Sequence, residues 1–125
     1  MNAEAAKLLQ FAEHKHATAL KLYEIEIFDA AGREAYLTAF AAARAVIIEK
    51  SGKAPKTHSG TRTIFAALIR EGLAFDTQLA KFLSDGFEIK SAADYADGAP
   101  VGRADAEDAI QTARKFIEAA QRALD

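Results

Sequence analysis

Apolar side chains recur three and four positions apart along almost the whole chain, which is the spacing that one face of an α-helix produces. We expect helices over residues 3–28, 33–50, 59–71, 76–93 and 104–124. The residues expected to face a shared core are Leu8, Leu9, Ala12, Ala19, Leu20, Tyr23, Ile27, Tyr36, Ala39, Phe40, Ala42, Ala43, Val46, Ile47, Ile64, Phe65, Leu68, Ile69, Leu79, Phe82, Leu83, Phe87, Ile110, Ala113, Ile117, Ala120 and Leu124. Amphipathic helices joined by short loops predict an all-α fold, an up-and-down antiparallel bundle of four to five helices.

Glycine, proline and capping residues place the helix ends. The first break is expected at residues 29–32, with Gly32 either ending the first helix or lying near the start of the second. The clearest loop is 51–55, and Gly72 is expected to close the third helix. Asp76 is a suitable N-cap for the fourth helix, which Gly86 should weaken in its middle.

The composition excludes several protein classes. The 125 residues suit one helical domain spanning residues 1–125, and half of them are apolar. Without cysteine there is no disulfide framework, thiolate metal site or cysteine nucleophile. No apolar run reaches the ~18 residues of a membrane span, and the N-terminus reads as an amphipathic helix rather than a signal peptide. We therefore expect a cytoplasmic protein without membrane contact and without a cofactor.

Positive charge is concentrated in one segment. Residues 50–70 carry five lysines and arginines and no acid, whereas the rest of the chain holds the other 11 basic residues and all 18 acidic ones. Such a local field attracts phosphate, a nucleotide, nucleic acid or an acidic protein surface. The alternative is that these side chains simply belong to a solvated loop.

Metal and phosphate sites of the standard kinds are not encoded. Glu13 and His16 share a helix face, as in one half of a di-metal site in a helical bundle, but no second Glu-x-x-His follows. We expect no metal and interpret these as surface residues. Glycine-rich phosphate loops and a serine nucleophile elbow are also missing.

Residues 56–60, KTHSG, offer a different anion site. Thr57 or Ser59 could cap the third helix, whose first backbone N–H groups would then attract an anion beside Lys56 and Arg62. A histidine in a positive field favours its neutral form, so His58 could act as a base near neutral pH. The alternative is that these residues only cap the helix and order the loop.

Arg44 lies in the nearly apolar stretch AFAAARAVII, so its side chain must reach the surface or find a partner. An ion pair with Asp94 and a phosphate contact are both open.

Three segments resemble a known family, the HEPN domains, in their small stand-alone bacterial and archaeal subfamily. Residues 35–46, AYLTAFAAARAV, resemble its motif AYYAxFHAARALL. KTHSG with Phe65 matches a second motif, and ADY at residues 93–95 matches a third, with Lys90 where arginine is usual. The resemblance covers nearly the whole chain, including Gly72 and the AxxF of residues 113–116.

The resemblance implies a helical bundle, commonly dimeric, with a role linked to RNA or nucleotides. Many members are toxins or partners of nucleotidyltransferase-fold proteins, and the ribonuclease members use an arginine followed four to six residues later by a histidine, without metal. This chain departs from that pattern, because Arg44 precedes His58 by fourteen residues and Ala41 and Leu37 replace the usual His and second Tyr.

We interpret the chain as a HEPN-like nucleotide- or RNA-linked binding module, paired with a nucleotidyltransferase-type partner in a toxin–antitoxin-like pair. Its expected ligand-binding residues are Arg44, Lys56, Thr57, His58, Ser59 and Arg62, with Tyr36 and Asp94 structural. One alternative is a metal-independent endoribonuclease with His58 as general base and Arg44 or Arg62 stabilising the phosphate. Another is a purely structural bundle. A homodimer could form through alanine-rich helix faces.

Overall fold

The computed structural model describes residues 1–95 and 100–124, and this part of the chain forms five α-helices and no strand. The helices are α1 (Ala3–Glu24), α2 (Phe28–Ser51), α3 (His58–Arg70), α4 (Thr77–Tyr95) and α5 (Arg103–Leu124). The side chains of residues 87–89 and 91–95 lie outside the described part, and the predictions for Phe87 and Asp94 fall there. The all-α prediction is confirmed. No described helix is long and apolar enough to cross a membrane.

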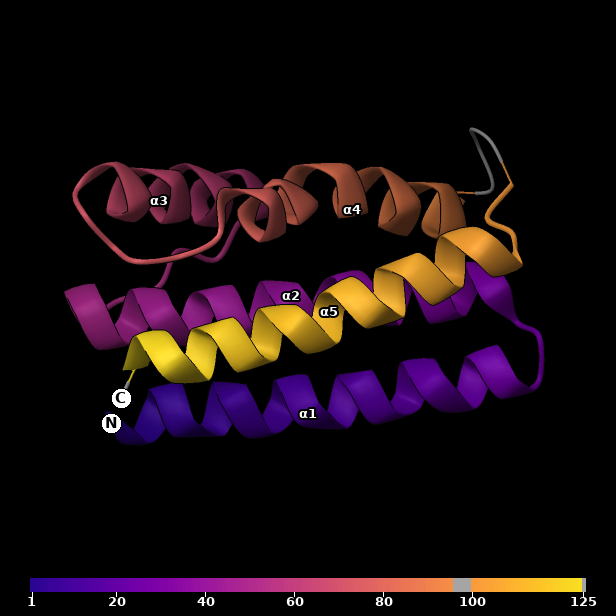
Figure 1. Ribbon diagram of the computed structural model, residues 1–125, viewed down its shortest axis with the longest axis horizontal. Helices are drawn as coiled ribbons and strands as arrows, with labels where there is room; N and C mark the ends of the chain where they lie inside the picture. The colour runs from indigo at the N-terminus through magenta and orange to yellow at the C-terminus, as the bar shows by residue number, and fades with distance from the viewer. Residues whose placement is uncertain (96–99, 125) are drawn as a thin grey trace.

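The four long helices run up and down the bundle. In Figure 1, α1, α2, α4 and α5 alternate in direction, so that both chain termini lie at the same end. Helix α1 forms one layer, α2 and α5 form the middle, and α3 and α4 lie on the opposite side. The antiparallel bundle predicted from periodicity is therefore confirmed.

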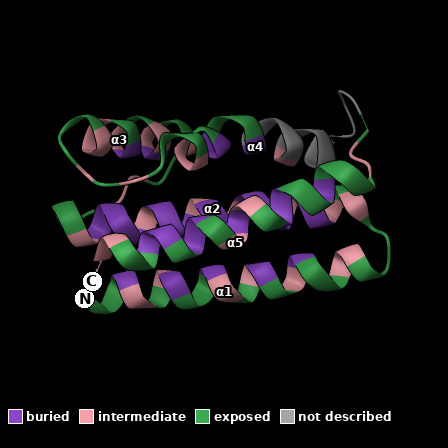
Figure 2. Cartoon of the chain, viewed as in Figure 1, coloured by how far each residue is buried: buried purple, intermediate pink, exposed green. Residues whose placement is uncertain are grey.

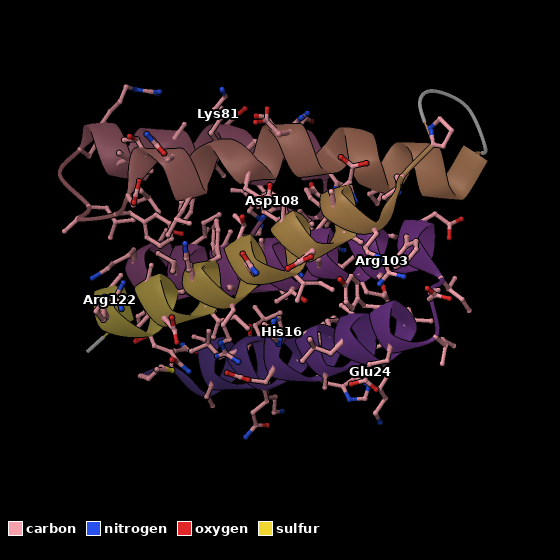
Figure 3. All side chains as sticks on the ribbon, turned by 45° about the vertical axis from the view of Figure 1, so that its right-hand side comes forward. His16, Glu24, Lys81, Arg103, Asp108 and Arg122 are labelled. Carbon is pink, nitrogen blue, oxygen red and sulfur yellow. The ribbon has the colours of Figure 1, made fainter. Side chains whose placement is uncertain are left out.

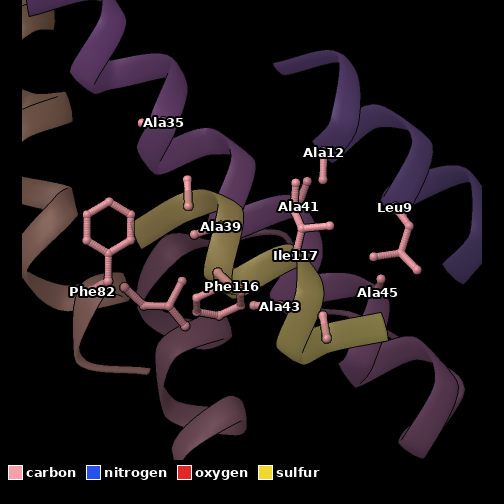
Figure 4. Close-up of a cluster of buried hydrophobic side chains, with 14 of the residues drawn as sticks. Leu9, Ala12, Ala35, Ala39, Ala41, Ala43, Ala45, Phe82, Phe116 and Ile117 are labelled. Atoms are coloured by element: carbon pink, nitrogen blue, oxygen red, sulfur yellow. The ribbon is translucent and has the colours of Figure 1, made fainter. Parts of the chain in front are cut away.

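Helix α2 is the centre of the core and packs against all four other helices. Its buried alanines point in several directions: Figure 4 shows Ala39 and Ala43 toward Phe116, and Ala41 toward α1. Because alanine adds only a methyl group, neighbouring helices can approach the α2 backbone closely. Figure 2 shows the buried positions along α2 between the outer layers. The alanine-rich faces that suggested a dimer contact are thus covered within the chain.

The first break lies at residues 25–27, earlier than the predicted 29–32, and Gly32 takes the second of its two expected places, near the start of the next helix. Helix α1 ends at Glu24, while Gly32 is buried inside α2. The Glu26 N–H donates to the Tyr23 carbonyl at 3.0 Å and the Ile27 N–H to the Leu22 carbonyl at 2.9 Å, the bonds of a Schellman helix end. Glu26 occupies its left-handed position with φ 65°, which glycine usually fills.

Two expected core residues are exposed. Leu20, by 41 %, lies on α1 outside its buried stripe, and Ile27, by 42 %, lies in the turn itself. Other end signals are confirmed. The Asp76 carboxylate accepts from the Gln78 N–H at 2.8 Å, and Gly72 follows α3 with φ 113°.

Enlarging a buried alanine of α2 tests the close packing. We expect Ala43→Leu to lower the free energy of unfolding by about 1–3 kcal/mol, since Ala43 is fully buried and extra methylenes force neighbours apart. The same change at the exposed Ala17 of α1 is the matched control and should alter stability by less than about 0.5 kcal/mol. Urea denaturation measures both, and equal effects would contradict this packing.

Candidate functional site

One ridge of α2 carries the large side chains of the site. Tyr36, Phe40 and Arg44 follow each other at intervals of four residues, so they lie on one face of the helix. The Tyr36 side chain is fully buried, Phe40 is half-buried, and the Arg44 guanidinium carbon lies 5.9 Å from the centre of the Phe40 ring. Arg44 is therefore half-buried beside an aromatic ring.

His58, the first residue of α3, packs against this ridge of α2. Its ring stacks on Phe40 with 4.3 Å between ring centres and 28° between planes. Its Nδ1 lies 3.0 Å from the Tyr36 hydroxyl oxygen, within hydrogen-bond distance. Arg44 and His58, fourteen residues apart in sequence, thus contact the same Phe40 ring, as a convergent site requires.

The residues around His58 hold the start of α3. Thr57 is the N-cap, and its hydroxyl accepts from the Gly60 N–H at 2.9 Å. A Cβ on Gly60 would lie 2.7 Å from that hydroxyl oxygen and 3.1 Å from the Pro55 Cβ, so only glycine fits between them. Of the two capping candidates, Thr57 is the cap and uses its hydroxyl there, while Ser59 is exposed in the first turn.

Positive charge surrounds the two rings. Burial raises the pKa of Tyr36 to about 12, against an opposing effect of the nearby Arg62 charge. The Tyr36 hydroxyl therefore keeps its proton near neutral pH and can donate it to His58 Nδ1. The Arg62 charge thus acts on the same hydroxyl, and exposed Lys56 lies just before the cap.

The Arg44 Nε atom is buried and forms no hydrogen bond within the described part of the chain. The expected ion pair with Asp94 involves a side chain outside that part. An unmatched buried donor costs about 1–3 kcal/mol. The Arg44 Nε atom is thus a buried donor without an acceptor among the described residues.

Helix α4 covers Tyr36 at a glycine. Gly86 is buried, and a Cβ there would lie 2.6 Å from Tyr36 Cδ1 and 3.3 Å from the Phe82 ring. The sequence predicts only that Gly86 weakens α4, whereas in the structure it lets the α4 backbone approach the ring. Sequence reasoning also treats Phe40 only as a core residue. The intervals of four from Tyr36 through Phe40 to Arg44 are the signal that could have identified it.

The pair Glu13 and His16 has a structural role, and the interpretation of His16 as a surface residue is wrong. The Glu13 carboxylate accepts two hydrogen bonds from Arg114, at 2.9 and 2.6 Å. His16 is buried between α1 and α5 with its Nε2 3.3 Å from the Ile110 carbonyl oxygen. Among the described residues, no three His, Cys, Asp or Glu side chains cluster to hold a metal.

Comparisons with known proteins identify the family expected from the motifs. A family model of the HEPN domain matches residues 5–123. A protein of Methanocaldococcus jannaschii named "Putative toxin MJ0142" is 25 % identical over 121 residues, which are 97 % of this chain and 82 % of that protein. The crystal structure of TT1696 from Thermus thermophilus shares the fold, with a TM-score of 0.84 at 21 % identity over 99 % of this chain and 100 % of that chain.

Burial of His16 makes stability depend on pH. Burial, together with the Arg114 charge, lowers the pKa of His16 below its ordinary 6.5. The hydrogen bond to the Ile110 carbonyl raises this pKa, but by less. As pH falls through about 6.5, the unfolded state takes up this proton first, so the free energy of unfolding decreases until the folded pKa is passed. We expect His16→Gln to remove that part of the pH dependence and His14→Gln, at an exposed position, to keep it. Denaturation between about pH 8 and 5 measures this, and identical slopes in all three proteins would contradict it.

Gly86→Ala should displace Tyr36. The added methyl cannot fit 2.6 Å from the ring, so we expect a loss of about 1–3 kcal/mol in stability. The altered contact between Tyr36 and His58 should also appear as shifted His58 resonances in NMR spectra. Unchanged stability and unchanged His58 resonances would show that α4 does not close on this ring.

Proposed function

Because the chain belongs to the HEPN domain family, we propose that it binds a nucleotide or the phosphate backbone of RNA and acts with a nucleotidyltransferase-fold partner in a toxin–antitoxin-like pair. The name of the Methanocaldococcus jannaschii relative supports the toxin part of this proposal. The binding site would comprise Arg44, His58 and Arg62, with Lys56 adding charge at its edge.

One observation carries the binding proposal: the buried Arg44 Nε has no acceptor among the described residues, and Arg44 shares the Phe40 ring with His58. A phosphate beside this ring would receive the Nε–H and adjoining guanidinium donors, in the forked geometry that arginine offers to phosphate. Satisfying a buried donor recovers the cost of leaving it unpaired. An anion that pairs with Arg44 therefore gains more binding free energy than it would gain at a fully exposed arginine.

The contact between Tyr36 and His58 suits the same role. When the Tyr36 hydroxyl donates to Nδ1, the neutral imidazole carries its proton on Nε2. Nε2 is then a second donor for the phosphate bound by Arg44. The neighbouring charge of Arg62 strengthens the attraction for an anion.

Metal-independent endoribonuclease activity is the second candidate, and the shared contact of Arg44 and His58 with Phe40 favours it. His58 would take the proton of a ribose 2′-hydroxyl as that oxygen attacks the adjacent phosphorus and the bond from phosphorus to the 5′-oxygen breaks. The departing 5′-oxygen would take a proton from water, which leaves a 2′,3′-cyclic phosphate, while Arg44 stabilises the negative charge on the phosphoryl oxygens. This requires the other tautomer, with Nδ1–H donating to Tyr36 and Nε2 unprotonated. Binding and cleavage thus use opposite tautomers of His58.

Binding of a fluorescein-labelled ten-nucleotide oligouridylate tests the leading proposal. We expect Arg44→Ala to weaken binding about ten- to a hundredfold, because charged hydrogen bonds contribute about 1.5–3 kcal/mol. The slope of log affinity against log salt should become shallower by about 0.7 for each phosphate that the variant no longer binds. Arg122→Ala, near the far end of α5 in Figure 3, is the matched control and should bind like the wild type. No binding by the wild type, or equally weakened binding by both variants, would contradict the proposal.

Incubation of the same oligouridylate in the presence of EDTA tests the second candidate. Cleavage by the wild type that His58→Ala abolishes would support the ribonuclease, and intact RNA would reject it. Co-purification with a nucleotidyltransferase-fold protein encoded beside this chain tests the partnership, and its failure at micromolar concentration would reject that part alone.

A further inference from the structure

A groove of about 300 Å³ lies between α3 and α4, on the side of the bundle away from α1. Its volume is at the lower end of the range for ligand pockets. It holds a few side chains rather than a whole helix. Arg62 reaches both this groove and the neighbourhood of Tyr36, so the groove begins where the candidate binding site ends.

The two walls of the groove have a regular arrangement of polar groups. On α3, Arg62, Ala66 and Arg70 follow at intervals of four, which places the two arginine positions about 12 Å apart along the helix. On α4, Thr77, Lys81 and Ser84 form the facing wall, so a cation lies between two hydroxyl groups. Figure 3 shows Lys81 on this outer layer.

The floor between these walls is apolar. Phe65 and Leu83 are buried there, with 1 % and 2 % of their surface exposed, and Ile69 and Ala80 are half-buried. No aspartate or glutamate of the described residues lines the groove. Among the described side chains, neither Arg70 nor Lys81 forms an ion pair. The groove is therefore an apolar strip bordered by cations, of which Arg70 and Lys81 have no ion-pair partner among the described residues.

We propose that this groove docks an acidic segment of a protein partner, in which one aliphatic side chain lies between two carboxylates. The aliphatic group would cover the strip beside Ala66, and the carboxylates would reach the arginines and Lys81. An extended chain spans about 13 Å in four residues, so acids at positions i and i+4 match the distance between Arg62 and Arg70. The existence of a protein partner rests on the proposed function, and the groove and its chemistry are new.

RNA fits this groove less well than such a segment does. Single-stranded nucleic acid is held by aromatic rings on which bases stack, along a charged channel. Phe65, the one aromatic residue among the described lining residues, is buried, and the strip between the cations is aliphatic. Apolar contact flanked by charge pairs is the pattern of a protein interface.

A labelled peptide of sequence Gly-Ser-Glu-Thr-Leu-Thr-Glu-Ser-Gly tests the docking, with a control in which glutamine replaces both glutamates. We expect the glutamine peptide to bind at least tenfold more weakly. The double variant Arg70→Ala with Lys81→Ala should bind the acidic peptide at least tenfold more weakly than the wild type does. Ala66→Phe, at an exposed position, should block the strip without removing charge. Unchanged melting temperatures establish that all variants fold, and Arg122→Ala should bind the peptide like the wild type.

Equal binding of both peptides, or full binding by the double variant, would overturn the proposal. Displacement of the peptide by oligouridylate from wild type and Arg44→Ala alike would also overturn it, in favour of an RNA track. The two proposals fail separately: Arg44→Ala should reduce only oligouridylate binding, and the double variant only peptide binding. Peptide binding without RNA binding would reject the proposed ligand and leave the docking groove standing.

Discussion

The small side chains of α2 are the constraint on which the rest of the structure depends. One helix contacts all four others, and this is possible because half of its buried positions are alanine. Methyl groups give little directional packing of their own, so the helices can approach closely only where the facing residues fill the remaining space. Phe116 and Phe65 do this on one side of α2, and their rings lie 5.7 Å apart. The position of α2 thereby decides where α3, α4 and α5 lie.

The ridge of Tyr36, Phe40 and Arg44 differs from its surroundings, because these three large residues lie among the alanines of the middle of α2. Each needs a specific accommodation. Tyr36 packs against a glycine of α4, and the Phe40 ring stacks on the His58 ring. Arg44 has a buried Nε without a partner among the described residues. The first two accommodations fix the rings in place. The third leaves a buried N–H donor without an acceptor among the described residues, and this is the basis for proposing a ligand here.

The position of His58 follows from several modest contributions rather than one strong one. The Thr57 cap contributes about 1 kcal/mol and the contact with the Tyr36 hydroxyl about 0.5–1.5 kcal/mol. Stacking on Phe40 adds a comparable amount. Together they hold the imidazole at the start of α3, next to the groove that α3 forms with α4. The proposed anion site and the proposed docking groove are therefore adjacent, and both include Arg62.

Sequence periodicity predicted the bundle because burial on a helix repeats every three to four residues whatever covers it. It did not predict the end of α1, because Glu26 adopts a backbone conformation that usually signals glycine. It also misplaced His16. The buried His16 ring contacts the carbonyl oxygen of Ile110, a residue 94 positions later in the sequence. For the site, the KTHSG motif and Arg44 were evident from the sequence. The groove residues Arg70 and Lys81 were not, because only the packing of α3 against α4 brings them together.

The central claim is that α2 and the start of α3 build one site around the Phe40 ring. Proton NMR of the His58 ring tests it most directly. The account predicts nuclear Overhauser contacts from the imidazole protons to both Phe40 and Tyr36, together with upfield shifts from stacking on Phe40 at 4.3 Å. An imidazole with the shifts of an exposed histidine and no contact to either ring would contradict it.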